Sequence, residues 1–272
     1  MSGSLRLENY LKRIRYTGAL APDLATLNAL HAAHVAAIPF EGLDPFCGRP
    51  VKLDLESIQA KLVDSPRGGY CFEQNTLFKA VLEAVGFEVT QLGARVRWMS
   101  PPDSPLGPRS HMLLKLDLDD GTYIADVGFG ACVMDAPLQL EEEIEQRTAM
   151  GTYRFDWRDG LFYLAVKQPN GWREMYAFNL EPQLPSDAEQ ANWFTSTYPA
   201  APFTSNVIVE RVDSSARYKL INRRYVKEAR EGEVVEERAI NDVDDCSKTF
   251  QEAFGIVLPS EIRQIFSRVP KD

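Results

Sequence analysis

Cys71 is the residue whose surroundings best suit covalent chemistry. It follows the pair Gly68-Gly69 and opens the segment CFEQNTLFKAVLEAVGF, whose apolar residues recur at helical spacing. A helix N-terminus lowers the pKa of a thiol, and the thiolate is the nucleophilic form. The glycines allow a ligand to approach closely, and backbone N–H groups beside Cys71 could hold an oxyanion. A buried, unreactive cysteine behind a glycine turn is the alternative.

A cysteine nucleophile needs a base, and the chain has only three histidines. His31 and His34 are three residues apart on the apolar face of an expected helix, which is typical of core, capping or paired surface histidines. His111 begins the segment HMLLKLDL directly after a proline-rich loop. Because the end of a strand can hold an imidazole at a cleft, His111 is the predicted base.

Asp126 is the candidate for orienting that base. It ends the apolar run TYIAD, which we expect to pair as a strand with HMLLKLDL across the turn at Asp119-Asp120-Gly121. A carboxylate there would fix the tautomer of His111 and stabilise its imidazolium form. An aspartate in an apolar run is costly to bury unless it has a partner. The alternative is an aspartate that caps the turn before Gly128.

The elements that must position these residues change character along the chain. Apolar spacing predicts helices near residues 7–14, 24–34, 53–63 and 71–85, with an irregular connection over residues 38–50. From residue 89, short alternating runs separated by turns predict a β-rich region. Beyond residue 187 we expect a helix at DAEQANWF, strands at FTSNVIVERV and RYKLINRRYVKEAR, and helical FQEAFG and PSEIRQIFSRV segments.

The composition excludes several classes of protein. The chain has 272 residues, of which 44% are hydrophobic and 25% charged, as in a globular protein of two or three packed subdomains. A net charge of −9 argues against non-specific binding of nucleic acid. No stretch approaches the ~20 apolar residues of a membrane span, so we expect a cytoplasmic protein. The four cysteines form no CxxC pair, which favours free thiols and predicts no metal site.

Around the three candidates the chain resembles the arylamine N-acetyltransferase family. The motifs that carry the resemblance, in the family's order and spacing, are RGGYCFEQN (67–75), SHM (110–112) and DVGFG (126–130). The segment IPFEGL (38–43) is also similar, with Gly42 where asparagine is more usual. The resemblance runs from about His31 to Gly130 and is weak in the C-terminal part.

The resemblance implies an α+β fold with a cysteine-protease-like catalytic core. Its expected parts are an N-terminal helical bundle (1–86) with the nucleophile, a central β-barrel (87–186) with His111 and Asp126, and a C-terminal α/β lid (187–272). Acetyl-CoA would acylate Cys71, and an arylamine, arylhydrazine or arylhydroxylamine would then take the acetyl group in a ping-pong reaction.

The resemblance also implies partners and roles for other residues. Acetyl-CoA would be a cosubstrate, with no permanently bound cofactor, and the partners would be small aromatic amines or hydrazines and coenzyme A. We expect no nucleic acid or membrane partner, and a monomer or homodimer. Arg67 would hold its loop by salt bridges. The residues implied for the acceptor pocket are Phe40, Val96, Phe129 and Phe203, and those implied for the pantetheine arm are Ser110, Phe129 and Gly130.

Three other functions remain open from the sequence. An amide synthase that releases or cyclises a polyketide chain uses the same triad and resembles the same family. A thiol hydrolase or transglutaminase-like enzyme is also compatible, because water can release an acyl-cysteine. A binding module that has lost catalysis and sequesters aromatic ligands is the non-enzymatic alternative.

Overall fold

The computed structural model describes residues 4–101, 103–258, 260–261 and 266–270. Its N-terminal part is mainly helical, as expected. The helices there are α1 (Leu7–Arg13), α2 (Leu24–Ala37), α3 (Leu43–Phe46), α4 (Leu55–Leu62) and α5 (Cys71–Val85). The side chain of Asp23 caps α2 by accepting from the Thr26 N–H, and Gly86 ends α5 in a left-handed conformation.

The central part is an eight-stranded antiparallel sheet in the order β5-β4-β3-β2-β9-β8-β7-β6. Gln139 in the edge strand β5 and Gln146 in the opposite edge strand β6 exchange two hydrogen bonds of 2.8 and 2.7 Å. The sheet therefore curves into a nearly closed barrel. Its strands are β2 (Val89–Val96), β3 (Arg109–Leu118), β4 (Gly121–Ala125), β5 (Leu138–Gln139), β6 (Gln146–Arg147), β7 (Thr152–Arg158), β8 (Leu161–Gln168) and β9 (Gly171–Pro182).

The C-terminal part forms a second sheet with the order β1-β10-β11-β12-β13. Helix α6 (Pro185–Thr197) leads to it from the barrel. The first strand of this second sheet, β1 (Phe40–Glu41), comes from the N-terminal part and pairs with β10. The other strands and short helices are α7 (Pro202–Ser205), β10 (Ile208–Val212), β11 (Arg217–Ile221), β12 (Arg224–Glu228), η1 (Arg230–Gly232), β13 (Val234–Ala239), α8 (Val243–Thr249), η2 (Phe250–Phe254) and η3 (Phe266–Arg268).

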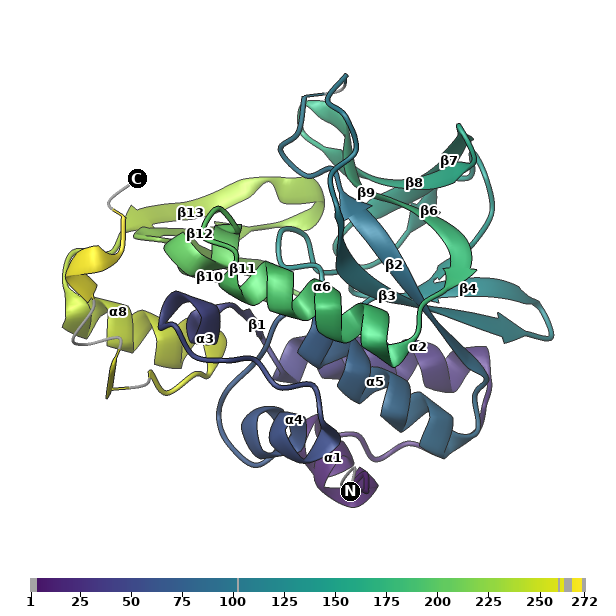
Figure 1. The fold of residues 1–272 in the computed structure, drawn as a ribbon, viewed down its shortest axis with the longest axis horizontal. Coiled ribbons are helices and arrows are strands. Elements are labelled where there is room, and N and C mark those ends of the chain that lie inside the picture. The colour runs from purple at the N-terminus through teal and green to yellow at the C-terminus, as the bar shows by residue number, and fades with distance from the viewer. Residues whose placement is uncertain (1–3, 102, 259, 262–265, 271–272) are drawn as a thin grey trace.

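The arrangement of the parts follows from their apolar faces. In Figure 1 the two sheets occupy the upper half of the molecule, while α1, α4 and α5 lie below them. One buried cluster joins these helices to β3 and β4, a second fills the barrel, and a third packs the C-terminal sheet against α8 and η2. None of the helices in the described part of the chain is long and apolar enough to cross a membrane.

The α+β expectation is confirmed, and the predicted pairing of β3 with β4 is present, with Lys115 opposite Ile124. Two local expectations are wrong. The connection over 38–50 holds β1, whose backbone pairs with β10, and the short helix α3; and residues 203–205, where the strand FTSNVIVERV was expected to begin, belong to α7. The expected helix at 259–269 lies partly outside the described residues. The boundaries at residues 86 and 186 stay predictions.

Candidate active site

Cys71 is the first residue of α5 and is 4% exposed. Its N-terminal neighbour Tyr70 donates its backbone N–H to Glu73 Oε2 at 3.1 Å, which closes the first turn of the helix. The Cys71 side chain lies 3.9 Å from the carbonyl oxygen of Ser110, at the start of β3. The helix start thus brings the thiol to the end of the barrel, as the sequence predicted.

The loop before Cys71 depends on close backbone approach. A Cβ atom on Gly68 would lie 1.9 Å from the carbonyl oxygen of Pro39, so only glycine fits there. The next carbonyl, that of Gly69, accepts from the backbone N–H of Glu41 at 3.0 Å. A Cβ on Gly128 would in turn lie 2.7 Å from the Cα of Cys71. These glycines let β1, the turn after β4 and the start of α5 meet.

His111 and Asp126 form a buried pair on the adjoining strands. His111 lies near the start of β3, and Asp126 directly follows β4. His111 Nε2 lies 2.7 Å from Asp126 Oδ2, and the two side chains are 3% and 0% exposed. Nε2 faces the aspartate, and the Cys71 side chain lies close enough to His111 to raise its pKa as well. His111 therefore lies next to both Asp126 and Cys71, so the three predicted residues come together.

The charges of this pair support each other. Burial lowers the pKa of His111, but the negative charge of Asp126, its hydrogen bond and the contact with Cys71 raise this pKa to about 10. Burial raises the pKa of Asp126, but His111 and the hydrogen bonds from Asn75 and the Gly128 N–H lower it below its ordinary value. At neutral pH the pair is therefore an imidazolium beside a carboxylate.

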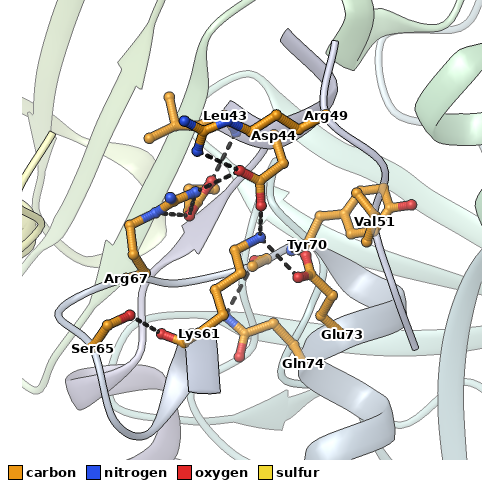
Figure 2. Close-up of polar contacts among 12 residues, drawn as sticks. Leu43, Asp44, Arg49, Val51, Lys61, Ser65, Arg67, Tyr70, Glu73 and Gln74 are labelled. Atoms are coloured by element: carbon orange, nitrogen blue, oxygen red, sulfur yellow. Dashed lines mark hydrogen bonds and ion pairs between the residues drawn. The ribbon is translucent and has the colours of Figure 1, made fainter. Parts of the chain in front are cut away.

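A network of ion pairs lies beside the loop that precedes Cys71 (Figure 2). Lys61 Nζ lies 2.6 Å from Asp44 Oδ2 and 2.7 Å from Glu73 Oε1. Arg67 is 3.1 Å from Asp44 Oδ1 and 2.7 Å from Glu41 Oε1. The network joins α3 and α4 to the first turn of α5. Arg67 makes the salt bridges that were expected of it.

A cavity of about 860 Å³ opens beside the thiol. Cys71 and His111 line it, whereas Asp126 lies behind His111. All the residues expected for the acceptor pocket and the pantetheine arm line the same cavity, namely Phe40, Val96, Ser110, Phe129, Gly130 and Phe203. Its volume is in the ~300–1,000 Å³ range of small-molecule sites.

Similarity to known proteins accompanies this geometry. Residues 23–263 match the N-acetyltransferase family. A protein of Mycolicibacterium smegmatis named arylamine N-acetyltransferase is 42% identical over 223 residues, which are 81% of this chain and 81% of that protein. The chain belongs to the arylamine N-acetyltransferase family. It is therefore an enzyme of the acyltransferase class.

Two further relatives of this N-acetyltransferase carry informative names. One from Salmonella typhimurium, named arylamine N-acetyltransferase / N-hydroxyarylamine O-acetyltransferase, is 35% identical over 251 residues, covering 92% of this chain and 88% of the relative. The structure of Mycobacterium marinum arylamine N-acetyltransferase in complex with CoA matches with a TM-score of 0.90 at 36% identity, covering 97% of this chain and 98% of that one.

The structure of this chain adds two site residues to which the sequence analysis gave no role. Asn75 follows Cys71 by one helical turn, and its side-chain amide donates to Asp126 Oδ1 at 3.0 Å and to the Met112 carbonyl at 2.7 Å. The spacing of four residues on a helix was the signal for it. The Tyr176 ring lies 5.0 Å from the His111 ring, and no sequence signal indicated this contact.

Charged and aromatic side chains at the cavity of this N-acetyltransferase could hold a donor. Trp98 lines the cavity, with the Arg173 guanidinium 5.0 Å and the Lys219 ammonium 6.0 Å from its ring. Both cations also line the cavity. Within the described residues no group of three or more metal-binding side chains gathers.

The two remaining histidines of the N-acetyltransferase are core residues. His34 Nε2 donates to Gln74 Oε1 at 2.7 Å, and Nδ1 of the neutral ring accepts from the Tyr10 hydroxyl at 2.8 Å. Burial lowers the pKa of His31 to about 3 and that of His34 to about 4. They stay neutral at physiological pH and belong to the packing of α2 against Phe78 of α5.

Proposed function

We propose that this enzyme transfers an acetyl group from acetyl-CoA to an arylamine, arylhydrazine or arylhydroxylamine through an acetyl-cysteine at Cys71. The observation that carries the proposal is that Cys71 and His111 line the same 860 Å³ cavity while Asp126 pairs with His111 behind it. A thiol, a base and an orienting carboxylate in this arrangement are the parts of a nucleophilic triad.

The first half-reaction acetylates Cys71. The Cys71 thiolate attacks the thioester carbonyl carbon of acetyl-CoA, and the tetrahedral intermediate expels CoA as its thiolate. The imidazolium of His111 gives its proton to that leaving sulfur, so CoA departs as a neutral thiol and His111 becomes neutral. Asp126 keeps the imidazole ring in place during both protonation states.

The second half-reaction transfers the acetyl group from Cys71 to the acceptor. The acceptor nitrogen, or the oxygen of a hydroxylamine, attacks the acetyl-cysteine carbonyl, and the bond between sulfur and carbon breaks. His111 takes the proton of the attacking atom, which restores the imidazolium and the thiolate. Because CoA has left, donor and acceptor use the same cavity in turn. This is a ping-pong mechanism.

The chemistry of the cavity supports these substrates. Arg173 and Lys219 beside Trp98 suit the phosphates and the adenine of CoA, and a relative was solved as a complex with CoA. The Phe40 and Phe203 rings, 5.8 Å apart, suit a flat aryl group. The name of the Salmonella typhimurium relative supports hydroxylamines as acceptors.

Intact-protein mass spectrometry tests the proposal. We expect acetyl-CoA alone to give one acetyl adduct, which peptide mapping assigns to Cys71 and which an aryl hydrazine removes with formation of the acetylhydrazide. Cys71→Ala should give no adduct. Cys132→Ala is the matched control, because Cys132 is also buried but lies in the barrel core, and it should be acetylated as the wild type is.

Two results would contradict the proposal. An intact protein that forms no adduct with acetyl-CoA does not use this donor, and an amide synthase that takes a longer acyl chain would then be favoured. An adduct that disappears equally fast without any acceptor would instead indicate a thioester hydrolase.

A further inference from the structure

His111 lies between two cavities. Besides the main one, a smaller cavity of about 320 Å³ opens between α6, β2 and β3. Its floor is made of the buried side chains of Phe72, Leu92 and Met112, together with His111. Cys71 lines only the main cavity. The smaller cavity therefore reaches the base of the triad without reaching the nucleophile.

The two cavities share part of their walls, which we call the partition. Pro108, His111 and Phe194 are the residues that line both of them. Phe194, in the last turn of α6, stacks on Tyr198 with a ring distance of 4.7 Å and an interplanar angle of 15°. Tyr198 lines the main cavity. Removing the Phe194 ring would join the two spaces beside His111.

The position of Phe194 matters for the acceptor. The attacking atom of the acceptor must come close to His111, because His111 takes the proton of that atom. Bulk far from that atom can extend into the rest of the 860 Å³ cavity, whereas bulk next to it meets the partition. The smaller cavity has an apolar floor and a rim of polar side chains such as Gln91 and Gln183, which suits an aryl substituent.

We propose that Phe194 is a specificity-determining residue that restricts acceptors with bulk adjacent to the reacting nitrogen, and that the cavity behind it would hold such a substituent. This rests on the proposed acetyl transfer. The class of acceptor affected is the ortho-substituted arylamine. Para-substituted arylamines of the same size direct their bulk away from the partition.

The two phenylanilines are the probes, because 2-phenylaniline and 4-phenylaniline differ only in the position of the second ring. Acetylated protein is prepared with acetyl-CoA, freed of donor, and mixed with each isomer, so that only the second half-reaction is measured. We expect Phe194→Ala to raise the ortho-to-para rate ratio about tenfold or more over the wild type, the size of effect that a changed apolar wall produces.

Three variants make the result specific. Trp193→Ala is the matched control: its side chain is 68% exposed on the same helix and lines neither cavity, so the ratio should not change. Ala191→Leu, which fills only the smaller cavity, should cancel the gain when added to Phe194→Ala. Phe194→Leu keeps apolar packing and should give an intermediate ratio even where the alanine variant folds poorly.

The outcomes separate this inference from the function beneath it. An acetylated wild type together with an unchanged isomer ratio in both Phe194 variants would overturn the role of Phe194 alone. A gain that Ala191→Leu does not reverse would show that the smaller cavity is not the space used, and would overturn the inference too. A wild type that never becomes acetylated would overturn the proposed function and this inference with it.

Discussion

Asp126 holds His111 with one carboxylate oxygen and is itself held by the other. Oδ2 lies 2.7 Å from His111 Nε2, while Oδ1 accepts from the Asn75 amide at 3.0 Å and the Gly128 N–H at 2.9 Å. The carboxylate cannot turn without losing these bonds. The orientation of His111 is therefore fixed from α5 as well as from the barrel.

Replacing Asp126 by asparagine should reduce activity at least about 100-fold, the lower end of the contribution of general acid–base catalysis. The negative charge that raises the pKa of His111 would be lost, so burial would leave His111 neutral at pH 7, without its positive charge beside the Cys71 side chain. Iodoacetamide alkylation of Cys71 as a function of pH measures this. Asp117→Asn, an exposed change on β3, the strand of His111, is the control, and equal alkylation profiles for the two variants would contradict the assignment.

The His111–Asp126 pair should also make stability fall at alkaline pH. The folded pKa of His111, about 10, is above the ordinary value of about 6.5, so its contribution is complete below pH 6.5 and is lost as the pH rises towards 10. Urea unfolding of the wild type and Asp126→Asn from pH 6 to 10 should show a stability difference that narrows with rising pH. A difference independent of pH would refute this.

His34 should make the protein sensitive to acid. Burial lowers its folded pKa to about 4, so the unfolded chain binds a proton between about pH 6.5 and 4 that the folded chain excludes. The resulting loss of stability is complete only below pH 4 and amounts to roughly 3 kcal/mol. Between pH 7 and 4.5, urea unfolding should show a smaller loss for His34→Gln than for the wild type. Equal losses would mean that other groups cause the acid sensitivity.

Lys61→Met should destabilise the fold by about 3–5 kcal/mol, because it leaves the buried carboxylate of Glu73 without its cation, whereas Asp44 keeps Arg67. Burial raises the pKa of Glu73 and Lys61 opposes that rise, so Glu73 loses its main compensation. Chemical denaturation measures the loss.

A surface pair on α5, the helix that carries Glu73, provides the control for that measurement. Lys79→Met breaks the Lys79–Glu83 pair and should cost about 0.5 kcal/mol or less. Adding Glu73→Gln to Lys61→Met should restore part of the loss, since the amide needs no counter-charge. If Lys61→Met costs no more than Lys79→Met, the network contributes little.

Gly42→Ala should weaken acceptor binding. A Cβ at this position would lie 2.7 Å from Cδ1 of Phe203, so the ring must move within the cavity that it lines. We expect the acceptor KM to rise about tenfold with the fold retained. Gly107→Ala is the control, since it lines the same cavity and its added Cβ would meet nothing within 4 Å. Equal KM values for both variants would show that Phe203 does not contact the acceptor.

Local patterns in the sequence were enough to identify the residues that meet at the thiol. Cys71 begins a helix because its apolar spacing starts there after two glycines, and His111 and Asp126 are neighbours because a short turn pairs their strands. These are local relations, set by periodicity and turn residues. They suffice to predict that the three side chains converge, and the family motifs add the expected chemistry.

The surroundings of these three residues depend on long-range packing. The network from Lys61 to Glu41, the contact of Tyr176 with His111 and the partition at Phe194 each join segments far apart in the chain. No local pattern encodes them, because they arise when an apolar helix face, a curved sheet and a loop pack together. Strand β1 also depends on a distant segment. Its two residues form a strand because β10, far along the chain, provides the hydrogen-bonding partner for their backbone.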